Sequence, residues 1–402
     1  MRISGLPRNE AIDLPQLETF LARRAAAHTP FATSRREKDI PRILQGITKG
    51  LTDGKTLIAV IANQDIRPQD YAATSDIPRP GHADYPAYIK DGAIPSGGGI
   101  YSGRMTAAYC IAGGIALQQL KKQGIHIQAE LDSVGGIPAE KETEIKKALA
   151  EAAEAGDSLG GIIRCTVTGL PPGLGDHPFR GLENHISQAI FAIPGIKGIA
   201  FGDGFALAAM KGSQANDAYR FEGGKVITET NHGGGISGGM ANGMPLHFRV
   251  AVKPTSSIAL PQNSINLATG ENVCLKIKGR HDVSIAPRAV PVVEAAAAVA
   301  LYDLLLGVKK GEEGLEDLRS RLMISDKALL KAFCQRMETV RTISDTKIKH
   351  QLPVFDPKRE EALLEELLTE TPPELKEAVK RLYPEILAIS RHFQEKWRNE
   401  SE

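Results

Sequence analysis

The spacing of hydrophobic positions changes near residue 310, and the change divides the chain into two parts. Before that point, short apolar runs such as 57–61 and 246–252 are separated by glycine-rich loops. After it, apolar residues recur three and four positions apart, which is the period of an amphipathic helix. The pattern therefore predicts a first domain of strands and helices, followed by an all-helical second domain.

The first part mixes strand and helix patterns without strict alternation, which favours the α+β class over a parallel βαβ fold. Helices are predicted at 13–24, 107–123, 140–155, 184–193 and 289–306. Strands are predicted at 57–61, 160–167, 198–205 and 246–252.

No glycine follows Gly314, and the remaining sequence has only helical periodicity. Three helices are predicted, at 315–347, 360–368 and 375–397, with prolines 353 and 357 in the first connection. A strand-free region after a glycine- and lysine-containing linker is typical of a separate domain. We expect domains at 1–307 and 315–402, joined by a linker at 308–314.

The composition is typical of a soluble globular protein and argues against several classes of partner. Of the 402 residues, 42% are hydrophobic and 24% charged. The 49 basic and 48 acidic residues give a net charge of +1, which predicts neither a nucleic-acid partner nor a membrane surface. With no signal peptide and no apolar run of about 18 residues, the sequence predicts a cytoplasmic protein.

The cysteines are scattered and lack C-x-x-C spacing, so we expect them to be reduced and buried, without a metal site. They are Cys110, Cys165, Cys274 and Cys334.

A glycine-rich stretch is the strongest chemical signal in the first part. Residues 230–243 include six glycines, and peptide N–H groups left bare by glycine suit anions. The segment 253–257 (KPTSS) adds one cation and three hydroxyls, and 280–282 (RHD) places a cation, a base and an acid side by side. Together these residues predict a site for a flat, phosphate-bearing ligand beside a proton-transfer pair.

The same stretch contains a spurious dinucleotide signature. Gly233, Gly235 and Gly238 satisfy G-x-G-x-x-G, but that fingerprint should end a strand and begin a helix. Here the turn sequence NGMP at 242–245 follows, and then the predicted strand 246–252. We therefore expect no Rossmann domain.

Residues 2–307 resemble chorismate synthase. The resemblance rests on motifs that occur in the family's order: RPGHAD (79–84), GLPPGLG (169–175), GDGF (202–205), NHGGGISGG (231–239), KPTSS (253–257), GRHD (279–282) and PRAVP (287–291). It implies a fold that sandwiches helices between sheets, a tetramer, and a reaction that eliminates phosphate from 5-enolpyruvylshikimate 3-phosphate to give chorismate. It further implies reduced FMN as the cofactor and an association of NADP with the reaction.

The resemblance also assigns roles to single residues. His82 matches the histidine that protonates the reduced flavin, and Asp282 the aspartate that assists proton removal. Arg104 is expected at the substrate. Flavin contacts are expected from Arg24, Ser102, Gly238, Lys253, Thr255, Ser256, Ser257 and Arg280. Taken singly, His82 could instead be a hydrogen-bonded core histidine, and Asp282 could pair with Arg280 or Arg288.

Two departures from the family bear on activity. The family begins with a Gly-Glu-Ser-His-Gly motif whose histidine is the proposed proton donor to the leaving phosphate, and this sequence starts downstream of it; a truncation or a misassigned start codon would explain this. At 100–105 the chain reads IYSGRM where many members have Arg-Ser-Ser-Ala-Arg-Glu, which leaves the flavin contacts at 100 and 101 open.

Residues 315–397 resemble the all-helical chorismate mutase family, with a three-helix fold in which two chains interlock. The expected polar positions are all occupied: Arg319, Arg336, Lys347, Asp356, Arg359, Glu360, Ser390 and Gln394. Ser390 and Gln394 are four residues apart and so share a helix face. The resemblance implies rearrangement of chorismate to prephenate without a cofactor.

In the mechanism that this resemblance implies, negative charge develops on the ether oxygen of chorismate. Lys347 and Gln394 would donate hydrogen bonds to that oxygen, while Arg319, Arg336 and Ser390 hold the two carboxylates. Asp356, Arg359 and Glu360 complete the substrate-binding set. Because a glutamine donates while neutral, we expect no requirement for an acid between about pH 5 and 8.

The sequence thus predicts a bifunctional enzyme in which one site makes the substrate of the other. Two alternatives remain open: a working mutase with an inactive synthase-like domain, or a first domain that only binds flavin or another polyanion.

Overall fold

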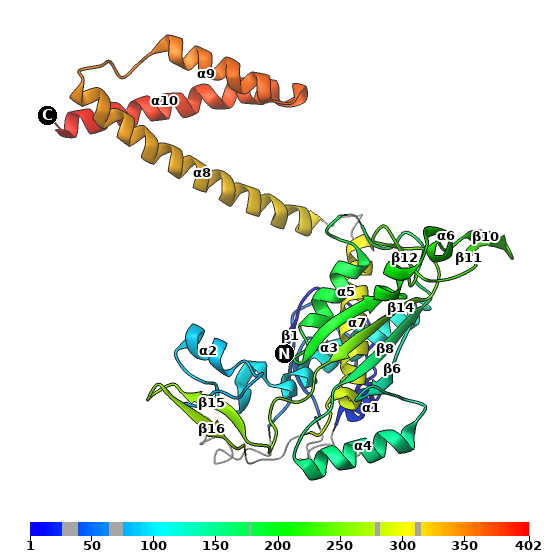
Figure 1. Ribbon diagram of the computed structural model, residues 1–402. Coiled ribbons are helices and arrows are strands. Elements are labelled where there is room, and N and C mark those ends of the chain that lie inside the picture. The colour runs from blue at the N-terminus through cyan, green and yellow to red at the C-terminus, as the bar shows by residue number, and fades with distance from the viewer. Residues whose placement is uncertain (26–38, 64–74, 177, 278–281, 310–314, 402) are drawn as a thin grey trace. The chain divides into compact units, whose positions relative to one another are not determined.

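The computed structural model describes residues 1–25, 39–63, 75–176, 178–277, 282–309 and 315–401. The chain divides into two compact units, Met1–Lys309 and Lys310–Glu402, which are drawn in Figure 1. We describe each unit by itself.

A five-stranded antiparallel sheet with the order β7-β6-β8-β14-β9 forms the frame of the first unit. Along β14, Phe248 and Val250 are fully buried while Arg249 between them is exposed. This alternation leaves one face of the sheet for the core. The strands are β6 (His126–Val134), β7 (Ile137–Pro138), β8 (Gly161–Thr168), β9 (Ile196–Phe201) and β14 (Leu246–Val252).

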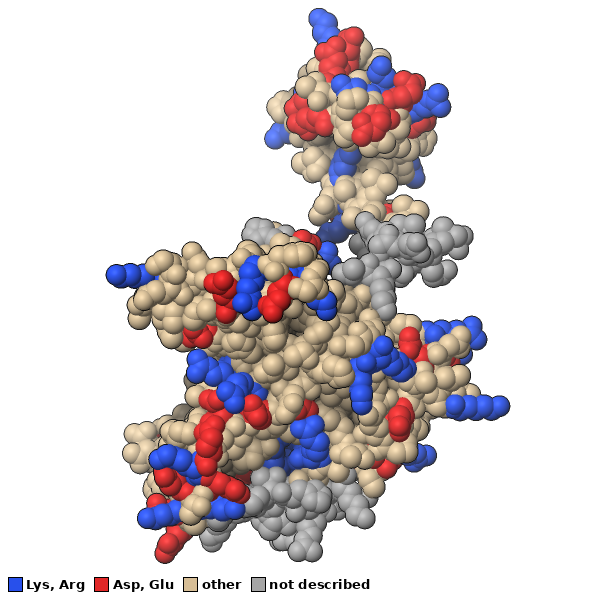
Figure 2. Space-filling view, turned by 90° about the vertical axis from the view of Figure 1, so that its right-hand side faces the viewer, with Lys and Arg blue, Asp and Glu red and all other residues tan. Residues whose placement is uncertain are grey.

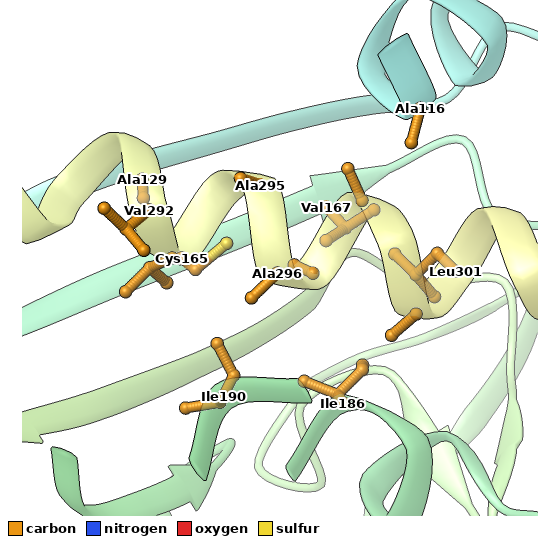
Figure 3. Packing of buried hydrophobic residues seen from close by; sticks show 14 of the residues in the cluster. Ala116, Ala129, Cys165, Val167, Ile186, Ile190, Val292, Ala295, Ala296 and Leu301 are labelled. Carbon is orange, nitrogen blue, oxygen red and sulfur yellow. The ribbon is translucent and has the colours of Figure 1, made fainter. Parts of the chain in front are cut away.

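The buried face of the sheet is covered by helices, of which α7 is central. It packs against α3, α5, β6 and β8, and Figure 3 shows its Val292, Ala296 and Leu301 among side chains of β8 and α5. The helices of this unit are α1 (Leu14–Arg24), α2 (Asp84–Asp91), α3 (Thr106–Lys122), α4 (Glu142–Ala155), α5 (Leu182–Phe191), α6 (Gly212–Ala215) and α7 (Ala286–Lys309), with 3-10 turns η3 (Ser96–Tyr101), η4 (Gly103–Met105) and η5 (Gly204–Ala209).

Smaller sheets complete the first unit. A three-stranded sheet has the order β1-β5-β2, and its Leu57 and Ala59 belong to the same hydrophobic cluster as the helices and the large sheet. The remaining strands form hairpins. Their bounds are β1 (Arg2–Ile3), β2 (Arg42–Gln45), β3 (Ile47–Thr48), β4 (Leu51–Thr52), β5 (Leu57–Val60), β10 (Tyr219–Glu222), β11 (Lys225–Thr228), β12 (Ile236–Ser237), β13 (Met240–Ala241), β15 (Gln262–Asn266) and β16 (Glu271–Leu275).

Close approach between α3 and α7 depends on small residues. A Cβ atom on Gly113 of α3 would lie 2.2 Å from the Cα of Ala295 of α7, and one on Gly114 would lie 2.5 Å from Leu17 of α1. The alanine-rich sequence of α7 and the two glycines of α3 therefore let three helices share one core. Within the described residues, α7 is the one helix long and apolar enough to cross a membrane, but most of it is buried inside the unit, as expected of a core helix.

The edge of the large sheet at β6 is closed by a side chain. Glu294 of α7 is buried, accepts the N–H of Ala129 at 2.9 Å, and forms a two-pronged ion pair with Arg23 of α1 at 2.6 and 2.9 Å. The pKa of Arg23 is raised, first by this hydrogen bond. A charge-assisted link therefore connects α1, α7 and β6.

The second unit consists of α8 (Leu315–Lys349), α9 (Pro357–Glu370), the short turn η6 (Pro373–Leu375) and α10 (Lys376–Ser401). Asp356 caps α9 by accepting the N–H of Arg359 at 3.1 Å. Among its described side chains only four are buried: Val340, Ser344, Ser390 and Gln394. Three of these four are polar, so this unit alone buries little hydrophobic surface.

The predicted α+β first domain and all-helical tail are both present. The predicted helix 13–24 is α1, begun by Asp13, which accepts the N–H of Gln16 at 2.9 Å. Strand β6 and the hairpin β15–β16 were not predicted. The expectation of four buried cysteines was wrong for two, because Cys274 and Cys334 are exposed, whereas Cys110 and Cys165 are buried.

Candidate active sites

A buried carboxylate organises the loop at 79–84. Asp84 is fully buried, and its two oxygens accept from Arg79 Nε at 2.7 Å and from the other arm of the Arg79 guanidinium at 2.8 Å. His82 Nδ1 lies 2.6 Å from Asp84 Oδ1. Burial pushes the pKa of Asp84 up, but the hydrogen bonds from Arg79 and His82 outweigh it and hold that pKa far below its usual range.

This arrangement fixes which nitrogen of His82 can exchange a proton. Nδ1 lies 2.6 Å from Asp84 Oδ1, which only accepts, and 3.2 Å from Arg79 Nη2, which only donates. We assign the Nδ1 hydrogen to the shorter contact, with Asp84, so Nε2 remains for a ligand. A Cβ at Gly98 would lie 3.3 Å from His82 Nε2. The glycine therefore leaves room beside the reactive nitrogen.

The KPTSS loop packs onto the same residues. Lys253 Nζ donates to the carbonyl of Gly81 and to Ser256 Oγ, the latter at 2.7 Å. Arg79 donates to Ser257 Oγ at 3.2 Å. Burial, and then the charge of Lys197, lower the pKa of Lys253. The structure thus brings His82, Lys253, Ser256 and Ser257 together at one place.

Thr255 in this loop has a hydroxyl without a protein partner. Its Oγ1 is buried and makes no hydrogen bond to any residue that the structure describes. A buried hydroxyl left unpaired costs about 1–3 kcal/mol, and a bound ligand would remove that cost. The ammonium of Lys253 in the same loop suits an anionic group.

A second cluster gathers around Arg24, which is buried at the end of α1. Arg24 donates to Thr106 Oγ1 at 2.9 Å, to the carbonyls of Gly103 and Arg104 at 3.2 and 3.3 Å, and to the carboxylate of Asp39. Its own carbonyl accepts from Arg288 at 3.2 Å. Arg24 therefore holds the loop before α3, where it was expected to face the flavin.

Asp282 pairs with Arg288 in this second cluster. One guanidinium nitrogen of Arg288 donates to both carboxylate oxygens, at 3.0 and 2.8 Å. Of the two partners considered from sequence, the structure shows the pair with Arg288, and Arg280 lies outside the described residues.

The loop of η3 and η4 connects the clusters. Its Gly98 lies against His82, and its Gly103 accepts from Arg24. Ser102 begins η4 by accepting the N–H of Arg104 at 3.3 Å. Seven predicted residues thus lie on one connected set of loops and helix ends: Arg24, Ser102, Arg104, Thr255, Ser256, Ser257 and Lys253, with His82 and Asp282 beside them.

Gly238 is not joined to this set by a described contact. It lies in the turn between β12 and β13, and the space where its Cβ would be is open. The hairpin also confirms that this G-x-G-x-x-G pattern does not begin a helix, so it is no Rossmann fingerprint.

Several of the amides expected to be bare in the glycine-rich stretch are already occupied. Asp217 accepts the N–H groups of His232 and Gly233, at 2.7 and 2.8 Å, and Asn231 Oδ1 accepts that of Gly235 at 2.7 Å. The glycines here serve backbone contact: a Cβ on Gly234, whose φ is +66°, would lie 2.4 Å from the nitrogen of Gly202. The chain's own carboxylate thus takes the place of the predicted anion.

In the helical unit, five of the eight predicted polar residues make side-chain contacts. Arg336 donates to Ser390 Oγ at 2.5 Å, and Lys347 Nζ donates to the carbonyl of Val354 at 2.6 Å. Glu360 is paired with Arg391. Asp356 is the cap of α9. The backbone of Arg319 belongs to α8, but its side chain lies outside the described part of the chain.

Gln394, like Thr255, has a buried polar atom that lacks a partner among the described residues. Its side chain is 7% exposed, and Oε1 makes no hydrogen bond within the described residues. The two ends of a glutamine amide are interchangeable by rotation, so a donor N–H₂ can occupy the same place. A hydrogen-bond acceptor on a ligand would then give this N–H₂ group its missing partner.

Sequence reasoning missed several residues of these sites. Arg79 and Asp84 lie in the quoted RPGHAD segment, where one histidine between an arginine and an aspartate is itself a signal of a charge-supported imidazole. Arg391 lies one residue after Ser390 and was not considered. Asp217 had no signal beyond its place in a polar loop.

Comparison with known proteins defines the class. The profile of the family described as chorismate synthase matches residues 1–306, and that described as chorismate mutase type II matches residues 318–395. The chain belongs to the chorismate synthase family and carries a type II chorismate mutase domain after it. It is therefore a bifunctional enzyme, a lyase joined to an isomerase.

Relatives of the first unit carry the same name. The chorismate synthase of Lancefieldella parvula is 43% identical over 351 residues, covering 78% of this chain and 92% of the relative. That of Thermococcus kodakarensis is 41% identical over 324 residues, covering 76% and 91%. A solved structure, "Crystal Structure of Chorismate Synthase", superimposes with a TM-score of 0.58 at 26% identity, covering 81% of this chain and 92% of that one.

Proposed function

We propose that the first unit eliminates phosphate from 5-enolpyruvylshikimate 3-phosphate to give chorismate, and that the second rearranges chorismate to prephenate. The observation that carries this proposal is the match of both units, in order, to the two families whose reactions are consecutive. The cation Lys253 in one unit, and Arg336 and Lys347 in the other, suit substrates that carry carboxylates and phosphate.

The residues of the first site fit a reduced flavin mononucleotide. Lys253, Ser256 and the unpaired hydroxyl of Thr255 would hold its polar groups. When bound, the flavin would lend and recover an electron and would supply a basic nitrogen, since the loss of phosphate and a proton involves no net oxidation. His82, held by Asp84 and open at Nε2, would hold a proton at the flavin edge, and Asp282 would assist in moving the substrate proton.

The second site needs no cofactor, because a pericyclic rearrangement only requires the right conformer and stabilisation of charge. Arg336 and Ser390 would bind one substrate carboxylate, and Arg319 the other. Lys347, now bonded to one carbonyl, retains two further N–H donors for the ether oxygen. Gln394 would turn its amide N–H₂ to the same oxygen. Arg359 and Asp356 stand at the start of α9 beside Glu360.

The carboxylate of Glu360 would accept a hydrogen bond from the substrate's ring hydroxyl. Chorismate carries two carboxylates and one hydroxyl, and of these only the hydroxyl can donate to Glu360. This contact does not change as the bonds rearrange, so it should contribute to binding more than to the chemical step.

We further propose that the enzyme is a cytoplasmic homo-oligomer, dimeric through the helical unit and tetrameric through the first. Leu322, Leu329 and Leu330 on α8 are each more than 60% exposed. The helix therefore leaves apolar side chains that its own unit does not cover. A second copy that covers them would bury this surface.

The test uses the purified full-length chain and its two substrates. With reduced FMN and the phosphorylated enolpyruvyl ether we expect phosphate release, and with chorismate alone we expect prephenate. His82→Ala should abolish only the first reaction. Flavin binding without phosphate release would favour the flavin-binding alternative, and a chain that leaves chorismate unchanged would refute the second half of the proposal.

A further inference from the structure

Arg391 is a cation of the helical unit for which the reaction, as described so far, has no use. It lies on α10 between Ser390 and Gln394, and its side chain is 30% exposed. Its guanidinium forms an ion pair with Glu360 of α9 and stacks over the ring of Phe355, 5.0 Å from the ring centroid. Arg391 therefore joins α10 both to α9 and to the connection before it.

The connection between α8 and α9 is held by three cations from two helices. Lys347 of α8 donates to the carbonyl of Val354, Arg398 of α10 donates to that of Leu352 at 2.8 Å, and Arg391 covers Phe355. Of these, Arg391 also reaches a carboxylate. It is thus the one of the three that fixes both the loop and the first turn of α9.

The charge of Glu360 explains why such a partner is needed. A carboxylate that faces a substrate with two negative charges is repelled by it. The guanidinium of Arg391, paired with Glu360, opposes this repulsion. The aromatic ring under Arg391 restricts its plane, so the orientation of the carboxylate is restricted as well.

We infer that Arg391 is a positioning residue of the mutase site, which acts through Glu360 on the binding of chorismate. The inference rests on the proposed function of this unit. Because Glu360 faces a part of the substrate that does not react, the loss of Arg391 should weaken binding of ground state and transition state alike.

The experiment compares steady-state kinetics of chorismate conversion for the full chain and five variants, which are Arg391→Gln, Arg391→Lys, Arg381→Gln, Glu360→Gln and the double variant of Arg391→Gln with Glu360→Gln. Arg391→Gln should raise KM about 10–100-fold and change kcat less than about three-fold, as expected for one charge-assisted hydrogen bond. Arg391→Lys, which keeps the charge but not the planar group, should lie between this variant and the wild type. Arg381→Gln is the matched control, since its pair with Glu377 on the same helix is exposed, and should change neither constant.

The decisive variant is Arg391→Gln combined with Glu360→Gln. If Arg391 acts through Glu360, the KM of the double variant should exceed that of Glu360→Gln alone by less than about two-fold. Equal effects in both backgrounds, or a fall in kcat without a rise in KM, would overturn the inference. Phosphate release by the first unit and the thermal midpoint report folding; if Arg391→Gln does not fold, the lysine variant and its double mutant decide by the same comparison.

Failure of the inference is distinguishable from failure of the proposed function. A wild-type chain that does not convert chorismate refutes the function itself. A wild-type chain that does, with an unchanged KM in Arg391→Gln, refutes only the role of Arg391.

Discussion

In both candidate sites, the partner of a single charged residue determines which hydrogen-bonding groups remain for a ligand. In the first unit, buried Asp84 satisfies Arg79 and directs the proton of His82, so the imidazole is oriented before any ligand arrives. In the second, Lys347 already donates to a backbone carbonyl. The motif identifies such residues, but the sequence does not show which partner each selects: Asp282 has an arginine on either side in sequence, and only the fold places Arg288 against it.

Lys347→Ala should lower kcat for chorismate rearrangement about 10²–10³-fold, because it removes a donor to the oxygen on which charge develops. The matched control is Lys349→Ala, which removes an exposed lysine at the end of the same helix and should leave kcat unchanged. Conversion is followed by the loss of chorismate absorbance. Equal kcat values for Lys347→Ala and wild type would contradict the assigned role.

Asp84→Asn should destabilise the first unit by about 3–5 kcal/mol at pH 7, since it leaves Arg79 buried without its counter-charge. The pKa of Asp84 is lowered in the folded state, so its stabilising contribution is complete above the unfolded value of about 4 and is lost as the pH falls through the folded value. Urea unfolding at pH 7 and pH 3 should therefore show a smaller difference between variant and wild type at pH 3. A difference that grows toward acid would exclude this account.

At the scale of elements, periodicity predicts long helices well and the sheet less well. The predicted 315–347 helix is α8, which ends two residues later, because apolar residues at helical spacing continue without glycine or proline. Strand β6 was missed, although its Ile127, Ala129 and Leu131 alternate with polar residues. The alternation of apolar and polar residues in so short a segment is a weaker signal than the periodicity of the charged helix that follows at 140–155. No pattern could show that Gly113 faces Ala295, since that contact depends on the path of two distant helices.

Gly113→Ala should lower the free energy of unfolding by about 1–3 kcal/mol, because the added methyl group overlaps the backbone of α7. Gly307→Ala is the control: it is also helical, has no atom within 4 Å of its Cβ position, and should raise stability by up to about 1 kcal/mol through helix propensity. Denaturant titration of both variants measures the two changes. Stabilisation by Gly113→Ala would mean that α3 and α7 do not pack this closely.

At the scale of the whole molecule, the two units differ in how they are stabilised. The first has a continuous hydrophobic cluster from both sheets and the helices, whereas the second buries mostly polar side chains. Figure 2 shows Lys and Arg interspersed with Asp and Glu over the visible surface, in agreement with the net charge of +1. The change in hydrophobic spacing near residue 310 indicated this division, but not that the helical unit would leave so many leucines uncovered.

Thiol reactivity should report the core of the first unit. Burial raises the pKa of Cys110 to about 12 and also raises that of Cys165, so neither thiol should react with a disulfide reagent in the native enzyme. Both should react once urea unfolds the chain. Rapid native labelling of Cys110 or Cys165, identified by peptide mass, would show that this core opens.

The hydrogen bond from Ala129 of β6 to the carboxylate of Glu294 bears on whether another chain can add a strand beside β6. An unguarded strand border is a template onto which a foreign segment can add, the first step toward fibrous deposits. With its N–H at Ala129 already bonded to the buried carboxylate of Glu294, β6 has no free donor at that position for an incoming strand. In the folded chain, one acidic side chain thereby removes a position at which a foreign strand could pair.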